Sequence, residues 1–213
     1  MVNITIKRGI FMAFGFFLNM EALSLKIAQE HIALMTDDNI KDDVSLENDK
    51  LLNNIKNGFV VITQLSTFME SFFNTILNSC IGYEDETLLK CSIDEKIAII
   101  FMHYNKTFDI IKSQNPWQIF RSTTKVRNEM IHFKKTYIGD GSDIPNFTIA
   151  NTSVRDFFTK SNMENTLNKH IALSMLIATE LGLKIASDVD IFSCDGCGDI
   201  VNYVYTPYKD DDE

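Results

Sequence analysis

The sequence RNEMIH at residues 127–132 contains side-chain types that could cleave RNA without a metal. His132 carries an imidazole, which titrates near neutral pH and can take and return a proton. Arg127 carries a guanidinium, which binds phosphate in a two-pronged contact and can stabilise the charge that develops on it. Asn128 lies one helical turn before His132, where its amide could orient the ring. We therefore predict that these three residues are catalytic, with His132 acting as the base for the 2′-hydroxyl.

A helix over residues 116–135 must position these side chains. Asn115 can cap this helix, and Pro116 can occupy its first position, where the missing N–H costs nothing. At about 100° per residue, five polar residues fall within about 40° of one line on the helix. They form a basic stripe: Arg121, Lys125, Asn128, His132 and Lys135. The opposite face carries apolar or small residues: Ile119, Thr123, Val126, Met130 and Phe133. We expect this face to pack inward and the stripe to face outward, with Arg121, Lys125 and Lys135 binding RNA.

The basic stripe also has a simpler interpretation, as the solvated face of an amphipathic helix. Arg127 lies about 120° from Arg121 around the helix axis, so it reaches the stripe only through its long side chain or from a partner helix. The combination of a base, a guanidinium and an amide nevertheless favours a catalytic role.

Four further helices are predicted, at residues 19–36, 47–80, 92–113 and 153–186. Apolar residues recur at three- and four-residue steps over residues 51–77, which is typical of a helix buried on a broad face. Ser92 and Glu95 have the spacing of a capping box. With only 9 Gly and 3 Pro in 213 residues, the chain favours long helices over many short strands. We predict an all-α bundle over residues 1–188.

A separate C-terminal segment, residues 189–213, is predicted to form a short β-hairpin followed by an acidic tail. Two β-prone runs, Val189–Phe192 and Ile200–Tyr205, flank an Asp-Gly pair, which is a hairpin signal. A further short strand is predicted at Phe147–Ile149. Cys194 and Cys197 lie at the hairpin tip, and a plain tip is the favoured interpretation. Zinc shared across a dimer and a redox pair are the alternatives. The other three histidines, His31, His103 and His170, are expected at helix surfaces or boundaries.

The formal net charge of −9 excludes a protein that coats nucleic acid by bulk electrostatics, so any RNA contact must be local. Four cysteines are too few for a disulfide scaffold in a chain of this length and indicate the cytoplasm. The apolar run at residues 9–18 is too short to span a bilayer and lacks a convincing cleavage site. We expect no membrane association.

Residues 47–186 resemble the HEPN superfamily, which includes prokaryotic toxins, abortive-infection nucleases and CRISPR-associated ribonucleases. The signature is Arg, a polar residue, a few variable residues and then His, and RNEMIH at 127–132 matches it. The preceding Asn-Pro-Trp at 115–117, and Glu70 and Asn74 on the long helix, are also similar to HEPN chains. The resemblance implies a HEPN-like bundle that needs no cofactor, and a homodimer in which two helices pool Arg127 and His132 into one RNA-cleaving site. Lys134 stands where toxins paired with nucleotidyltransferase antitoxins have Tyr, so regulation by modification of that residue is not implied.

Three functions are compatible with these features. The first is a metal-independent endoribonuclease in phage defence or a toxin–antitoxin system, with an antitoxin or another protein as a further partner. The second is a non-catalytic HEPN-like module for protein interaction or dimerisation, which the acidic composition would suit. The third is a small regulatory protein with a ligand pocket inside the bundle.

Overall fold

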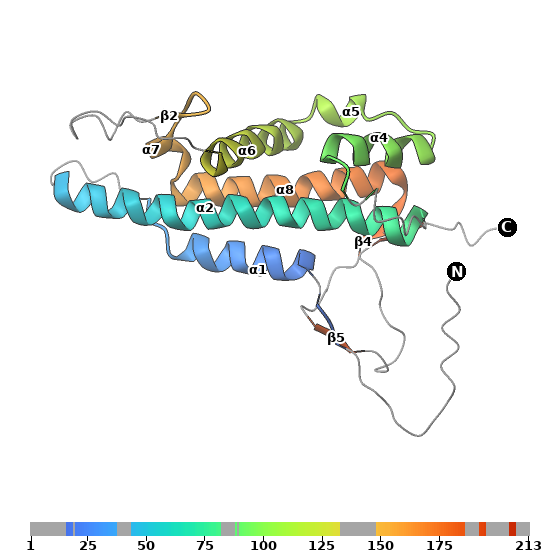
Figure 1. Ribbon diagram of the computed structural model, residues 1–213, viewed down its shortest axis with the longest axis horizontal. Helices are drawn as coiled ribbons and strands as arrows, with labels where there is room; N and C mark the ends of the chain where they lie inside the picture. Colours follow the sequence, from blue (N-terminus) through green and yellow to red (C-terminus); the bar gives the residue numbers. More distant parts are fainter. Residues whose placement is uncertain are drawn as a thin grey trace, which may run out of the picture.

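Two long helices, α2 and α8, run side by side through the centre of the computed structural model (Figure 1). The structure describes residues 16–18, 20–37, 44–81, 88, 90–132, 148–185, 192–194 and 205–207. Helix α1 lies along one side of this central pair, and α4, α5 and α6 lie along the other. The helices are α1 (Met20–Ala33), α2 (Val44–Thr75), the π-helical turn η1 (Ile76–Ile81), α4 (Ile93–His103), α5 (Asp109–Lys112), α6 (Asn115–Ile131), α7 (Val154–Phe157) and α8 (Lys160–Leu181). The predicted all-α architecture is therefore confirmed.

The apolar face of α2 is the centre of the hydrophobic core. Leu52, nearer the start of the helix, is exposed, whereas from residue 61 onwards the buried apolar residues follow the predicted spacing: Val61, Ile62, Leu65, Phe68, Met69, Phe72 and Phe73, continued by Ile76 and Leu77 of η1. Towards η1 this face packs with α4, α5, α6 and α8 in one cluster of buried side chains. Nearer its start, the face packs with α1, α6, α7 and α8 in a second cluster. Helix α6 contributes buried side chains to both clusters, and packing in the two clusters fixes the orientation of this helix.

Polar side chains set several helix ends. Ser92 and Glu95 form the predicted capping box, in which Ser92 Oγ accepts from Glu95 N and the Glu95 carboxylate accepts from Ser92 N. These contacts with Ser92 lower the pKa of Glu95. Beyond the end of α1, Asn54 of α2 holds Thr36, since its amide accepts from Thr36 N at 3.0 Å and donates to Thr36 O at 2.8 Å. Pro116 lies in the first turn of α6, but the cap predicted at Asn115 was wrong: α6 begins at Asn115, and Gln114 is its N-cap without a side-chain hydrogen bond.

Two predicted helices are interrupted. The helix predicted at 92–113 is divided into α4 and α5 because Asn105 adopts a left-handed conformation with φ 51°. The helix predicted at 153–186 is divided into α7 and α8, and α8 stops at Gly182, whose φ of 68° gives the left-handed cap that glycine favours. Residues Leu183–Ile185 then form strand β4 instead of continuing the helix.

Within the described residues, the strands are short and form three antiparallel pairs. They are β1 (Phe16–Leu18), β2 (Thr148–Ile149), β3 (Thr152–Ser153), β4 (Leu183–Ile185), β5 (Phe192–Cys194) and β6 (Tyr205–Pro207). β2 pairs with β3, β1 with β5, and β4 with β6. Short strands in the C-terminal segment were predicted and occur, but the described strands pair with β1 and β4 instead of with each other. β1 was not predicted, and its pairing depends on contacts more than 170 residues apart, which local patterns do not encode.

No helix within the described ranges is both long enough and apolar enough to cross a membrane.

Candidate functional site on helix α6

Helix α6 presents the predicted basic stripe outward. Pro116, Trp117, Phe120, Thr123 and Val126 are buried against the core. The stripe residues on the other side are exposed: Arg121, Lys125, Asn128 and His132. Lys135, the last predicted member of the stripe, and Phe133 lie outside the described residues. The described residues of the stripe are therefore exposed as predicted, whereas the inward face is only partly as predicted: Thr123 and Val126 are buried, but Ile119 and Met130 are half-buried.

Arg127 and Asn128 are held together at one edge of the stripe. Arg127 Nη1 donates to Asn128 Oδ1 at 3.0 Å. Arg127 itself is half-buried, and its Nε is buried with no hydrogen-bond partner in the described part of the chain. The guanidinium thus reaches round the helix to the stripe, as its wheel position required. In the described part of the chain, the hydrogen bond of the Asn128 amide is with Arg127, and none joins Asn128 to the His132 ring.

His132 ends α6. Its backbone N–H donates to Asn128 O at 3.0 Å, which closes the last turn, and its side chain is exposed. Among the described residues, no side chain forms a hydrogen bond or ion pair with the His132 ring. As far as the described residues determine, the imidazole is therefore open to a second protein chain or to a substrate.

The two described cations of the stripe differ in whether they form an ion pair. Arg121 Nη1 donates to both carboxylate oxygens of Asp94 at 2.9 Å, and its guanidinium lies 5.5 Å from the centre of the Trp117 ring. Such an exposed ion pair contributes only about 0–1 kcal/mol, so an RNA phosphate could compete for Arg121 at modest cost. Lys125 is exposed and has no ion-pair partner in the described ranges.

A tight turn lies against the last two turns of α6. The Glu129 carboxylate, which belongs to the RNEMIH motif, accepts from Ala150 N at 2.6 Å. Ala150 is the first residue of the two-residue loop between β2 and β3. The sequence did not predict this contact. Ala150 is 21 residues from Glu129, and alanine is not a residue type that indicates a left-handed turn.

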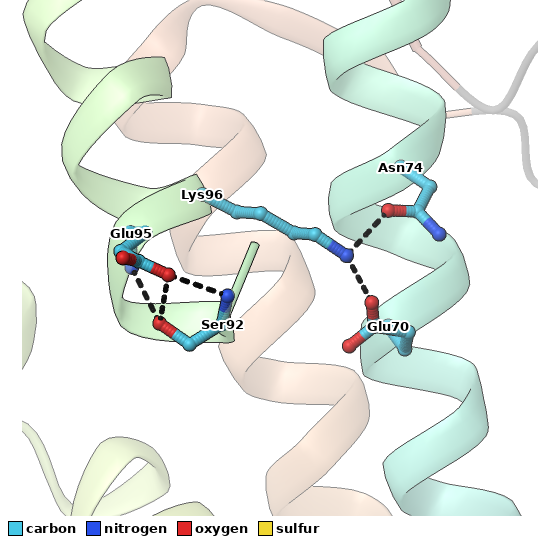
Figure 2. Close-up of polar contacts among 5 residues, drawn as sticks. All are labelled: Glu70, Asn74, Ser92, Glu95 and Lys96. Carbon is cyan, nitrogen blue, oxygen red and sulfur yellow. Dashed lines mark hydrogen bonds and ion pairs between the residues drawn. The ribbon is translucent and has the colours of Figure 1, made fainter. Parts of the chain in front are cut away.

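A second polar cluster joins α2 to α4 (Figure 2). Figure 2 shows Lys96 reaching from α4 to Glu70 and Asn74 on α2, the two residues that resembled HEPN chains. Lys96 Nζ forms an ion pair with Glu70 and donates to Asn74 Oδ1 at 2.8 Å. The Lys96 side chain is completely buried, whereas that of Glu70 is 42% exposed. The burial of Lys96 was not predicted from the sequence. Lys96 precedes the core residue Ile100 by four positions, and this spacing places both residues on the same face of α4.

The first turn of α4 is thereby attached on two sides. Asp94 binds Arg121 of α6, and Lys96 binds Glu70 and Asn74 of α2. Through these contacts α4 links α6 to α2, because Asp94 of α4 pairs with Arg121 of α6 and Lys96 of α4 pairs with Glu70 of α2.

Two buried titratable groups lie elsewhere in the bundle. Glu21 of α1 accepts a hydrogen bond from Thr75 Oγ1 at 2.6 Å, while Glu21 Oε2 and the nearby buried Ser24 Oγ have no hydrogen-bond partner among the residues that the structure describes. Burial raises the pKa of Glu21 to about 7, against the opposing effect of the Thr75 hydroxyl. The surface position expected for His170 was wrong: it is buried, with Nδ1 2.8 Å from Thr166 O.

Burial lowers the pKa of His170 to about 4, so its ring is neutral at physiological pH. The ring lies against Phe120 of α6, with 5.7 Å between centroids. His31 and His103 do lie at helix surfaces or boundaries, as expected. His170 is buried because Phe120 of α6 packs against its ring and Thr166 O of its own helix provides a hydrogen-bond partner. The periodicity of α8 alone does not predict the contact with Phe120.

The cysteine pair remains a sequence-based prediction. Cys194 is the last residue of β5, opposite Phe16 of β1, and Cys197 lies outside the described residues. Within the described part, no three His, Cys, Asp or Glu side chains lie close enough together to hold a metal ion.

Compared with protein-family models, curated proteins and solved structures, the chain matches none.

Proposed function

We propose that this protein is a metal-independent endoribonuclease of HEPN type that acts in the cytoplasm, in phage defence or a toxin–antitoxin system. The observation that carries the proposal is the arrangement at the end of α6. There, Arg127 forms a hydrogen bond with Asn128, and the exposed His132 ring has no partner among the described residues. A proton-transfer group and a phosphate-binding cation therefore occur on one exposed helix end. Lys125 adds a cation for the RNA backbone.

The chemistry proceeds by attack within the RNA. His132 removes the proton of a 2′-hydroxyl, and the resulting oxygen attacks the adjacent phosphorus. Arg127 stabilises the negative charge on the phosphate oxygens as the bond to the 5′-oxygen breaks. A protonated imidazole then returns a proton to that leaving oxygen. The products are a 2′,3′-cyclic phosphate and a free 5′-hydroxyl.

A two-fold dimer completes the site. Arg127 and His132 are separated by about 140° around α6, which makes it difficult for one chain to direct both groups at one phosphate. If two α6 helices face each other, Arg127 of one copy lies near His132 of the other. Two imidazoles then serve as base and acid for one cleavage.

Cleavage in EDTA tests the proposal. Wild type should cut single-stranded or loop RNA with no divalent metal present and leave a 2′,3′-cyclic phosphate or its hydrolysis product. His132→Ala should lower the rate by about 10²–10⁴-fold, since proton transfer typically contributes that much. His103→Ala, which removes an exposed histidine on α4, is the matched control and should cleave as wild type does. Equal cleavage by wild type and His132→Ala would refute the assignment.

A non-catalytic interaction module is the second candidate. The observation that favours it is Ile131, a large apolar side chain 47% exposed in the last turn of α6, together with the occupation of Arg121 by Asp94. An apolar group at this position suits a protein interface, and the paired Arg121 leaves fewer free cations for RNA. A stable dimer that cleaves no RNA in EDTA or in magnesium would support this candidate over the nuclease.

A further inference from the structure

The loop between β2 and β3 holds two non-glycine residues in a disfavoured conformation. Ala150 and Asn151 have φ of 55° and 61°, and the pairing of Ile149 with Thr152 makes them a two-residue hairpin loop. Positive φ at both central positions defines a type I′ turn, for which Asn-Gly is the preferred pair. Asn tolerates this conformation, but Ala does not adopt it readily because its Cβ crowds the following carbonyl. Contacts from outside the turn must therefore stabilise it.

Glu129 of α6 supplies a polar contact to this turn. Its carboxylate accepts from Ala150 N at 2.6 Å, a charge-assisted hydrogen bond to the residue that is most strained. Beneath this contact, Ile149 is buried in the same apolar cluster as Val126 of α6. Glu129 itself is exposed, so its role in the core is minor.

The position of Glu129 places the turn next to the proposed site. Glu129 precedes His132 by three residues and follows Lys125 by four, and side chains at these spacings are neighbours on a helix surface. Around the helix axis, Glu129 lies about 60° from His132 on the side away from Asn128. The Arg127–Asn128 pair borders the stripe on one edge, and the Glu129-bound turn borders it on the other.

We infer that Glu129 is a positioning residue of this site, whose carboxylate holds the Ala150–Asn151 turn as a wall beside His132 and so aligns RNA for attack. The inference rests on the proposed ribonuclease function and adds to it a role for Glu129, to which the motif assigns none, and a segment that lies outside the motif. Glu129 takes no part in proton transfer. It acts through the turn, and a turn that forms without it restores activity.

A rescue experiment tests this role. Glu129→Ala should lower kcat for RNA cleavage in EDTA by roughly tenfold to a hundredfold, because a displacement of about 1 Å can have that effect. Glu129→Gln, which keeps an acceptor oxygen, should lose less. Converting the loop to Asn-Gly (Ala150→Asn with Asn151→Gly) in the Glu129→Ala background should recover kcat to within about threefold of wild type, since this pair adopts the turn unaided. Glu164→Ala, on the exposed side of α8, is the control for loss of one carboxylate.

The outcomes separate the turn from the chemistry. Faster hydrogen exchange at the Ala150 amide in Glu129→Ala than in wild type would confirm that the carboxylate holds the turn. Unchanged kcat in Glu129→Ala, in an active protein that needs His132, would overturn this inference alone. Failure of the Asn-Gly loop to restore kcat would also overturn it, because Glu129 would then act by another route. An inactive wild type would overturn the proposed function, and this role of Glu129 with it.

Discussion

Replacing Glu21 with Gln should change how the stability of the protein depends on pH. Glu21 and His170 are both buried, and burial shifts their pKa values in opposite directions, to about 7 and about 4. Glu21 therefore binds a proton more tightly in the folded state, and His170 binds one less tightly. As pH rises through nearly the same range, the first shift lowers the free energy of unfolding and the second raises it.

The direction of each effect follows from proton binding. Between pH 4.5 and about 7, folded Glu21 is protonated and unfolded Glu21 is not, so its contribution to stability is lost as pH rises. Between about pH 4 and 6.5, unfolded His170 is protonated and folded His170 is not, so its contribution is gained as pH rises. From about pH 4.5 to 6.5 the two contributions offset each other in the wild-type protein.

The magnitude follows from the size of the shift. Each pKa differs from its ordinary value by about 2.5 units, and at about 1.4 kcal/mol per unit this is roughly 3 kcal/mol. Glu21→Gln keeps an acceptor for Thr75 and adds an amide N–H that could donate to Ser24 Oγ, which has no hydrogen-bond partner among the described residues. The variant should match wild type near pH 4.5 and become more stable than wild type by roughly 3 kcal/mol as pH rises past 7.

Urea unfolding at a series of pH values measures this difference. Trp117 is the only tryptophan and is buried, so its fluorescence reports unfolding directly. Glu30→Gln changes an exposed carboxylate on the same helix and serves as the matched control. His170→Gln should show the mirror effect, with stability relative to wild type greatest at low pH. A difference between Glu21→Gln and wild type that stays constant from pH 4.5 to 7.5 would show that Glu21 is not protonated in the folded protein.

Three further predictions concern packing, the buried ion pair and RNA binding. Gly58→Ala should lower the free energy of unfolding by about 1–3 kcal/mol in urea titrations, despite the better helix propensity of Ala, because its Cβ would lie 2.3 Å from the buried Phe158 ring; greater stability would contradict this packing argument. Glu70→Ala should destabilise by about 3–5 kcal/mol and Lys96→Met by less, since only the first change leaves a completely buried charge without its carboxylate; the reverse order in the same titrations would be inconsistent with the contacts observed. Lys125→Ala should weaken RNA binding and reduce its dependence on salt concentration by about one counterion, as measured by filter binding at several salt concentrations, and an unchanged salt slope would exclude a phosphate contact.

Several features of the fold could be predicted from the sequence because they depend on neighbouring residues. The apolar spacing along residues 51–77 indicates which face of α2 is buried, and the same periodicity orients α6 with its basic stripe outward. The Ser92–Glu95 capping box and Pro116 in the first turn of α6 are likewise local. The capping box satisfies backbone N–H groups of its own turn, and proline has no N–H that would need a partner at this position.

Other features depend on contacts between distant segments. Asn105 interrupts the predicted third helix in a conformation that its type permits but does not require. His170 is buried because Phe120 of another helix covers it, and Lys96 is buried because Glu70 and Asn74 provide partners across α2 and α4. The partners of β5 and β6 are β1 and β4, which a turn signal between the two strands cannot reveal.

The candidate site divides in the same way. The sequence by itself determined the residue types of the RNEMIH motif, their helical spacing and the exposure of the stripe, because these follow from the composition and period of a single helix. Only the tertiary structure decided that Arg121 is paired with Asp94 and that the Glu129 carboxylate accepts a hydrogen bond from Ala150 N. Both contacts join residues more than 20 positions apart, and the packing of the bundle determines which distant side chains come within hydrogen-bond distance.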